Sequence, residues 1–269
     1  LEIMGFDPEE ITIDKNDEPA WRRYYSLLKN TFVYSVRRIN FVGYDFAHSP
    51  SPHALDPAIK GHGTEVAGVA AGSGSVNPDM TGVAPGACLW AVKTVWDLAG
   101  GGFEEWGMAG FDYAVRGPDG TPGTGDEPDV IAHTTGSPGI SDGFSAMGAM
   151  LDIASEQGIV VVQSAGNQPA SMYTLNESAS SRNAITVGAL TENLQAVQGR
   201  SSRGPTADMR IKPDLVAPGQ NIYTTKAQTA HNLGDPGYQP YTITSGTSIA
   251  VPYVAGVAAL IKQRHPDWT

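Results

Sequence analysis

Short apolar runs alternate with segments of helical periodicity along most of this chain. The apolar runs predict strands at residues 39–46, 89–95, 130–135, 159–164 and 184–190. Between them, apolar positions three and four residues apart predict helices at residues 65–71, 103–115, 145–156 and 249–264. Strands that are apolar throughout and alternate with helices are typical of a parallel sheet covered on both faces. The pattern therefore predicts a three-layer α/β fold with a mostly parallel central sheet and helices on both faces.

The first 38 residues do not share this alternation. They are dense in charged side chains, contain a single glycine, Gly5, and allow one short helix from Trp21 to about Lys29. We therefore expect residues 1–38 to form a charged insertion or an irregular N-terminal segment, and residues 39–269 to form the main domain.

The composition narrows the classes of function. The chain has 269 residues, which is enough for one large domain with a substantial core. Its formal net charge of −11 argues against nucleic acid or an anionic membrane as a partner. The single cysteine, Cys88, excludes an internal disulfide framework and a cysteine-based zinc site. No uncharged apolar run approaches the ~18 residues of a membrane span.

A histidine and a serine each stand before a helix-like segment rich in small residues. His62 lies between two glycines, and its ordinary pKa near 6.5 suits general-base chemistry at neutral pH. Ser248 precedes the apolar segment at residues 249–264, where backbone N–H groups and the helix dipole would stabilise an alkoxide or an oxyanion. Each residue also has a structural interpretation, the first as a packing histidine and the second as a helix N-cap.

An asparagine follows the apolar strand predicted at residues 159–164. Asn167 comes directly after Ala165 and Gly166. An asparagine amide fixed at the end of a rigid strand can donate a hydrogen bond to an oxyanion. An asparagine turn that closes a strand is the structural alternative. Neither this residue, nor the histidine, nor the serine identifies a function alone.

Taken together, these residues resemble the subtilisin-like serine protease family, the subtilases, over residues 39–269. The histidine motif of the family is similar to residues 62–68, its asparagine motif to residues 165–167, and its serine motif to residues 246–252. Three supporting segments follow the order of the family, at residues 81–85, 201–205 and 212–219. Six matches in the correct order are far more specific than any single motif.

The resemblance implies a serine endopeptidase that works through an acyl-enzyme. His62 would be the general base and Ser248 the nucleophile, and Asn167 would form an oxyanion hole with the backbone N–H of the serine. The family binds its substrate as an added strand between two backbone edges, and a further run lines the pocket for the side chain before the scissile bond. The positions that match these contacts are Gly100, Gly101, Gly102, Thr134, Thr135, Gly136, Ser164, Ala165 and Gly166.

The same resemblance implies polypeptide substrates, a pro-peptide in a full-length precursor and secretion to the extracellular space. It implies no cofactor for the chemistry. Structural calcium is common in the family, so acidic loop residues such as Asp79, Asp119 and Asp126 are candidate ligands, although each is more simply explained as a solvated loop charge.

The family pattern fails at the aspartate of the catalytic triad. Residues 1–61 contain neither its Asp-Ser/Thr-Gly motif nor the His-Pro-Asp/Glu motif that follows. We expect the acid on a strand upstream of Leu1, with Asp14 as the second candidate, and we expect the final helices of the family to be absent as well. Without the acid, turnover would fall by roughly 10⁴. A catalytically impaired homologue that acts as a peptide-binding module is therefore the main alternative.

Other enzyme classes fit less well. An α/β-hydrolase places its histidine after the serine and the acid, and here only His265 follows Ser248. A chymotrypsin-like protease needs an all-β barrel, which the alternation of strands and helices argues against. A zinc carboxypeptidase would use His62 and Glu65, one helical turn apart, with a third ligand such as His133.

Overall fold

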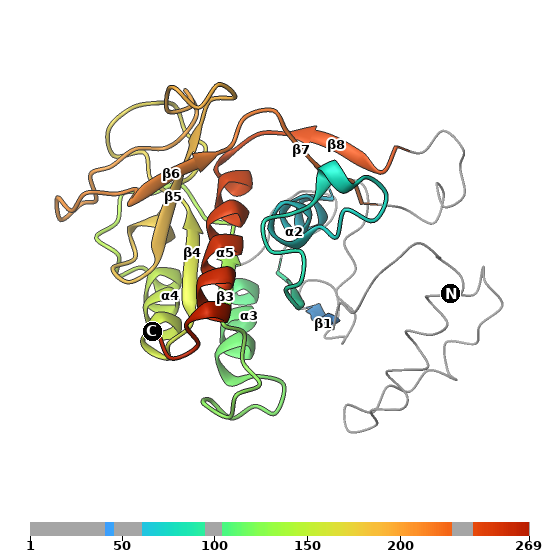
Figure 1. Ribbon diagram of the computed structural model, residues 1–269. Helices are drawn as coiled ribbons and strands as arrows, with labels where there is room; N and C mark the ends of the chain where they lie inside the picture. The colour runs from blue at the N-terminus through green and yellow to red at the C-terminus, as the bar shows by residue number, and fades with distance from the viewer. Residues whose placement is uncertain (1–40, 46–60, 95–103, 228–238, 269) are drawn as a thin grey trace. The chain divides into compact units, whose positions relative to one another are not determined.

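The computed structural model describes residues 41–45, 61–94, 104–227 and 239–268 (Figure 1). Contacts divide the chain into Leu1–Arg38 and Ile39–Thr269, and all described residues belong to the second unit. The helix predicted from Trp21 to Lys29 and the substrate edge predicted at residues 100–102 lie outside the described residues. The character of the first 38 residues as an insertion stays a prediction.

Helices and strands alternate along the chain as the sequence predicts. In chain order they are β1 (Phe41–Asp45), α2 (His62–Ala71), η3 (Pro78–Met80), β2 (Leu89–Lys93), α3 (Glu104–Arg116), β3 (Val130–His133), α4 (Ala146–Glu156), β4 (Val160–Ser164), η4 (Ser178–Ser180), β5 (Ile185–Leu190), β6 (Leu215–Pro218), β7 (Ile222–Thr225), β8 (Tyr241–Thr244) and α5 (Thr247–Arg264). The two η elements are short 3-10 turns. Every strand and helix predicted from residue 39 onward is present, with ends shifted by no more than three residues.

Four strands form the main sheet in the order β3-β4-β5-β6, and all of them run parallel. β1 and β2 form a separate parallel pair, and β7 and β8 form an antiparallel pair. In the main sheet His133, the last residue of β3, pairs with Gln163 near the end of β4. The segments that follow these two strands therefore leave the sheet side by side at its C-terminal edge, which is where open α/β sheets bind ligands.

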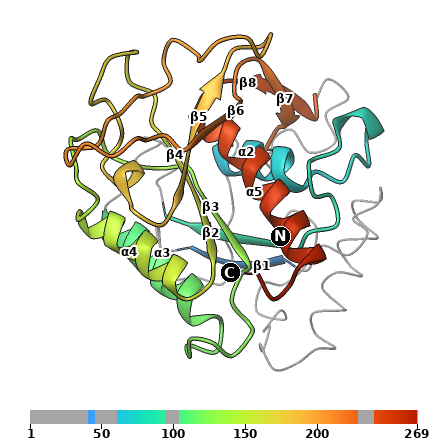
Figure 2. The ribbon, with the colours of Figure 1, turned by 60° about the vertical axis from the view of Figure 1, so that its left-hand side comes forward.

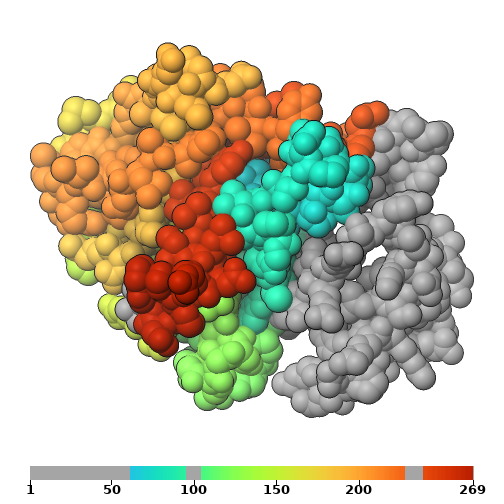
Figure 3. All heavy atoms as spheres, viewed as in Figure 1, coloured from blue at the N-terminus to red at the C-terminus, as the bar shows by residue number. Residues whose placement is uncertain are grey.

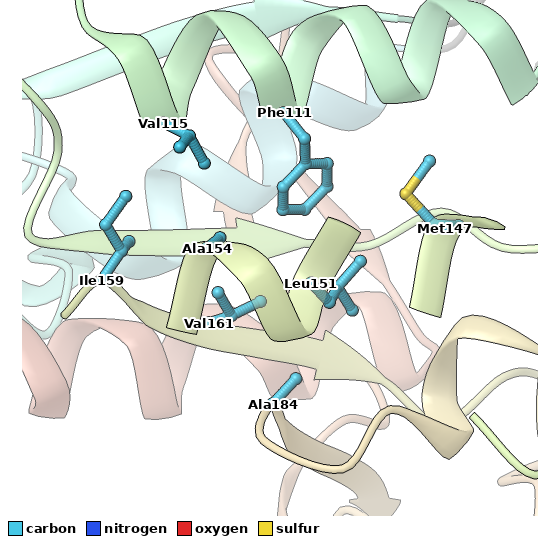
Figure 4. Close-up of a cluster of buried hydrophobic side chains, with 8 residues drawn as sticks. All are labelled: Phe111, Val115, Met147, Leu151, Ala154, Ile159, Val161 and Ala184. Carbon is cyan, nitrogen blue, oxygen red and sulfur yellow. The ribbon is translucent and has the colours of Figure 1, made fainter. Parts of the chain in front are cut away.

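Helices cover both faces of the main sheet (Figure 2). On one face, Phe111 of α3 and Leu151 of α4 pack with Val161 of β4 (Figure 4). On the other face, Val251 of α5 belongs to one buried cluster with Val162 of β4. Val161 and Val162 point to opposite faces because successive side chains of a strand alternate. These contacts confirm the three-layer α/β fold.

Helix α2 packs against α5, and residues 61–94 and α5 lie beside each other on the surface (Figure 3). Val66 and Val69 of α2 form a buried cluster with Ile249 of α5. A β-carbon at Gly256 would come within 2.6 Å of Val83, so only glycine allows α5 to approach the segment after α2 this closely. None of the helices in the described part of the chain is long and apolar enough to cross a membrane.

Three strands are absent from the sequence-based prediction, namely β6, β7 and β8. β6 is the edge strand of the main sheet, where Leu215 and Val216 are 40% and 38% exposed. β7 and β8 carry several threonines and include half-buried or exposed positions. A search for wholly apolar runs finds buried central strands and misses short strands at an edge.

A buried polar network links the ends of β3 and β4. The side chain of Gln163 is fully buried, and its Nε2 donates to the carbonyl oxygens of Ser164 at 2.9 Å and Thr135 at 3.2 Å. Its Oε1 lies 2.5 Å from Nδ1 of His133, so this nitrogen carries the proton of a neutral imidazole. The other ring nitrogen then accepts from the hydroxyl of Thr135 at 2.8 Å. The network holds the chain after β3 against the chain after β4.

Burial lowers the pKa of His133 to about 4, although the hydrogen bond with Gln163 acts in the opposite direction. The ring of Phe111 meets the imidazole edge-on with centroids 5.0 Å apart, which adds to its apolar surroundings. In the unfolded chain the same histidine would titrate near its ordinary pKa of about 6.5. The folded state therefore binds this proton less readily than the unfolded state does.

We expect the free energy of unfolding to fall as the pH is lowered from about 6.5 to about 4, because only the unfolded chain takes up the proton readily. Chemical denaturation at about pH 7 and about pH 4.5 measures this loss. The loss is expected to be smaller in His133→Met, which has no titrating ring. His265→Gln is the control and should keep the full pH dependence. An equal loss in His133→Met and the starting protein would contradict the prediction.

Candidate active site

Ser248 lies in the first turn of α5. The helix begins at Thr247, and its N-cap is Gly246, whose φ of 148° lies in the region that favours glycine. The N-cap glycine has no side chain to accept from the first N–H groups of the helix, so acceptors from elsewhere in the chain can take these bonds. Ser248 is 8% exposed, and its hydroxyl donates to the carbonyl oxygen of Thr134 at 3.2 Å. Ser248 is therefore not an N-cap, and its hydroxyl faces the chain that follows β3.

Asn167 is held at the start of the same helix. Its Oδ1 accepts from the backbone N–H of Thr247 at 2.9 Å and from the Thr247 hydroxyl at 3.2 Å. The Thr247 hydroxyl in turn accepts from the N–H of Gly166 at 3.3 Å. Because a backbone N–H can only donate, the amide oxygen must face Thr247 and the amide Nδ2 must face away. Asn167 is exposed, so Nδ2 is accessible to a ligand.

His62 is the first residue of α2, after Gly61 with a φ of 62°. Strand β7 fixes this end of the helix from the outside. The hydroxyl of Thr224 donates to the carbonyl oxygen of Glu65 at 2.6 Å, and that of Thr225 donates to the carbonyl oxygen of Thr64 at 2.7 Å. The imidazole of the histidine is half-buried. The sequence predicts the helix entrance correctly, and β7 supplies a support that the sequence did not reveal.

A cavity of about 1790 Å³ lies between β2 and β3, which belong to different sheets. Side chains of both strands line it, together with residues of α2 and α5. His62, Thr134, Gly136, Ser164 and Asn167 are all on its wall. The structure therefore brings the predicted histidine, the predicted asparagine, the predicted substrate edge at residues 134–136 and part of the predicted pocket wall to one cavity. The predicted serine adjoins the cavity through its hydrogen bond to Thr134.

Two groups at this site escaped the sequence analysis. Gln163, which ties the two strand ends together, is polar within an otherwise apolar strand, and that exception was the available signal. The sequence suggests His133 only as a possible zinc ligand and does not predict its hydrogen bond to Gln163. Its two ring nitrogens are both hydrogen-bonded, so it does not complete a zinc site with His62 and Glu65.

The acidic residues of the loop after α3 serve the loop itself. Asp126 accepts from the N–H of Asp119 at 3.0 Å, and Asp119 accepts from the N–H of Thr121 at 2.7 Å. Glu127 accepts from the N–H of Gly125 at 2.9 Å. No cluster of three or more histidine, cysteine or acidic side chains suited to a metal ion occurs among the described residues. Calcium binding stays a prediction.

Comparison with known proteins gives a consistent result. The Subtilase family matches this chain over residues 25–269. Serine protease AprX of Bacillus subtilis (strain 168) is 36% identical over an alignment of 228 residues, and the match covers 78% of this chain and 50% of that protein. Subtilisin NAT of Bacillus subtilis subsp. natto is 36% identical over 211 residues, 77% of this chain and 47% of that protein. The chain thus spans about half the length of the curated relatives it matches.

Solved structures share the fold. Sphericase superposes with a TM-score of 0.68 at 28% identity, over 84% of this chain and 71% of that chain. S41 Psychrophilic Protease gives a TM-score of 0.66 at 28% identity, over 83% of this chain and 70% of that chain. The ordered motifs, the relatives and the shared fold agree, and this chain belongs to the Subtilase family, the subtilisin-like serine proteases.

Proposed function

We propose that this chain carries the catalytic machinery of a serine endopeptidase. The observation that supports it most directly is the contact between Asn167 and Thr247, the residue before Ser248. Because this contact uses Oδ1, the Nδ2 donor of the asparagine has no hydrogen-bond partner among the described residues and lies at the start of α5. Donors fixed in this way stabilise an oxyanion without reorganising during the reaction.

In the proposed reaction, the hydroxyl of Ser248 turns from Thr134 to His62, which takes its proton as the oxygen attacks the peptide carbonyl. The new oxyanion accepts hydrogen bonds from Nδ2 of Asn167 and the backbone N–H of Ser248. Collapse of the tetrahedral intermediate breaks the C–N bond, and the histidine gives its proton to the leaving amine. Water, deprotonated by the same histidine, then hydrolyses the acyl-enzyme.

The substrate of this enzyme would be a polypeptide bound as an added strand. One edge would be residues 134–136 and the other residues 100–102, and residues 164–166 would lie beside the side chain before the scissile bond. The carbonyl oxygen of Thr134 supports this arrangement, because it already accepts a hydrogen bond from Ser248. A substrate N–H can take the place of that hydroxyl.

We place the acid of the triad on an extended segment in the cavity between β2 and β3. A parallel strand in this cavity would have a hydrogen-bonding neighbour on each side, and its C-terminal end would lie near Thr134. His62 lines the same cavity, so a carboxylate at that end would face its imidazole. A segment upstream of Leu1 is the first candidate for this strand, and the segment that ends at Asp14 is the second.

We also propose, from family membership, a secreted enzyme that is made with a pro-peptide and needs no cofactor for its chemistry. Calcium would act as a structural ion. The net charge of −11 supports the absence of a nucleic-acid partner. The alternative function is a peptide-binding module with impaired catalysis, and covalent labelling of the serine distinguishes the two.

We expect a fluorophosphonate probe to label the chain on Ser248 even without the triad acid, because the histidine and the oxyanion donors keep part of the activation of a triad serine. Mass spectrometry of the digested protein locates the label. Ser248→Ala should abolish labelling, and Ser245→Ala, at an exposed position three residues earlier, should preserve it. Labelling that survives in Ser248→Ala would contradict the assignment of the nucleophile. No labelling of the starting protein would favour the peptide-binding alternative.

We expect Asp14→Asn to leave the labelling rate of Ser248 unchanged, because the first candidate places the acid upstream of Leu1. The rate is measured under pseudo-first-order conditions with the same probe. Asp17→Asn is the matched control in the same charged segment. A selective loss in Asp14→Asn, by up to roughly 10⁴, would instead identify Asp14 as the acid.

Asn167→Ala should lower kcat by about 10²–10³ with little change in KM, by analogy with the loss of this donor in a subtilisin. The donor acts on the oxyanion, which exists in the transition state and not in the bound substrate. Steady-state kinetics on a peptide substrate measures both parameters. Asn193→Ala, in an exposed turn, is the control. A rise in KM at unchanged kcat would show that Asn167 binds substrate instead.

A further inference from the structure

The proposed binding site of the side chain before the scissile bond lies between two walls, residues 134–136 and residues 164–166. Residues 176 and 177 cross from one wall to the other. The N–H of Asn176 donates to the carbonyl oxygen of Ala165 at 3.0 Å, in the run that follows β4. The N–H of Glu177 donates to the carbonyl oxygen of Ser137 at 3.0 Å, in the run that follows β3. This segment is therefore fixed to both walls by its backbone.

The side chain of Asn176 fills the space between the walls. A β-carbon at Gly136 would lie 2.9 Å from Nδ2 of Asn176 and 2.9 Å from Oγ of Ser178. A β-carbon at Gly166 would lie 2.6 Å from Oδ1 of Asn176. The amide thus reaches from one glycine to the other, and each glycine leaves the room that it occupies.

Asn176 and Ser178 form a floor between the two walls, and this floor has an unpartnered hydrogen-bonding group. Asn176 is 7% exposed and Ser178 is 2% exposed. The hydroxyl of Ser178 has no hydrogen-bond partner among the described residues, although a buried hydroxyl normally has one. Asn176 and Ser178 line the same cavity as Gly136 and Ser164. An unpartnered hydroxyl at this position points to a ligand that supplies the missing partner.

The floor is also uncharged. Glu177, between its two polar members, lines the same cavity, but its carboxylate is placed beside Gly139. A β-carbon at Gly139 would collide with Oε1 of Glu177, so the carboxylate lies against Gly139 and not against Gly136. The groups that face the space between the walls are an amide and a hydroxyl, and both can donate and accept.

We propose that Asn176 and Ser178 form the floor of the pocket for the P1 side chain, the one before the scissile bond, and select small uncharged hydrogen-bonding residues such as asparagine and serine. The proposal rests on the proposed function, which places P1 between these walls. A large apolar P1 side chain would meet the Asn176 amide before it was fully buried. It would also cover the exposed part of the amide without replacing its hydrogen bonds to water, and it would leave the buried hydroxyl of Ser178 unpartnered.

Binding of cleaved peptides tests the proposal without requiring catalysis. The Ser248→Ala chain is titrated with N-terminally labelled peptides that share one sequence and end in asparagine, serine, leucine or phenylalanine, and fluorescence anisotropy gives Kd. We expect the asparagine and serine peptides to bind at least about tenfold more tightly than the phenylalanine peptide. Leucine or phenylalanine as the tightest ligand would overturn the proposal, as would failure of all four peptides to bind.

Two further variants separate the size of the floor from its polarity. In Asn176→Ala the order is expected to reverse in favour of leucine and phenylalanine, because the floor is opened. In Ser178→Ala the advantage of asparagine and serine should fall by about tenfold, with phenylalanine still excluded. Glu177→Gln is the matched control and should change neither order nor affinity. Thermal unfolding of each variant verifies folding, and an unchanged order in both floor variants would overturn the proposal.

The peptide-binding result and the labelling result test different assignments, namely the P1 pocket and the catalytic serine. Absence of fluorophosphonate labelling at Ser248 with the P1 preference intact would refute the proposed peptidase and leave the pocket assignment standing. Labelling at Ser248 with no preference among the four peptides would do the reverse.

Discussion

The hydrogen bonds between Asn167 and Thr247 determine the geometry of the whole site. They connect the end of β4 to the first residue of α5, and the N–H of Gly166 adds a third bond to the same threonine. The end of β4 and the start of α5 therefore form one hydrogen-bonded unit. The proposed nucleophile follows Thr247 directly, so its position relative to the asparagine amide is set by one residue of helix.

Buried packing surrounds this unit and holds it in place. The first turns of α5 are buried, with Ala250 and Val251 in the cluster that covers β4 and β5. Ile249 packs toward α2, whose first residue is His62. Below the site, Gln163 and His133 hold the two strand ends at a fixed separation. Apolar packing thus supplies the position of each element, and a few buried hydrogen bonds supply the alignment of the groups between them.

The sequence predicts most of the fold and the residues of the candidate active site. β3, β4 and β5 are mostly apolar strands of the main sheet, and parallel sheets covered on both faces produce that pattern. The motifs around Asn167 and Ser248 are local, so a short stretch of sequence carries each of them.

The parts that the sequence did not reveal depend on contacts between distant segments. Gln163 meets His133 because β3 and β4 pair in one register, and no local pattern specifies that register. From the sequence alone, Asn176 is an ordinary loop residue, and only the folded structure shows that it lies between the two walls. The triad acid, the calcium sites and the role of the first 38 residues stay predictions for the same reason. Each depends on contacts between distant segments, which a local motif does not specify.

The two threonines of β7 that hold the first turn of α2 have a consequence for the order of assembly. Thr224 and Thr225 bind carbonyl oxygens 159 and 161 residues earlier in the chain. Contacts of such long sequence separation form late in folding, because a large loop must close before they contribute. A nascent chain emerging from the ribosome would carry the histidine long before it carried the strand that supports it. The first turn of α2 would therefore gain these two hydrogen bonds only after β7 has been synthesised.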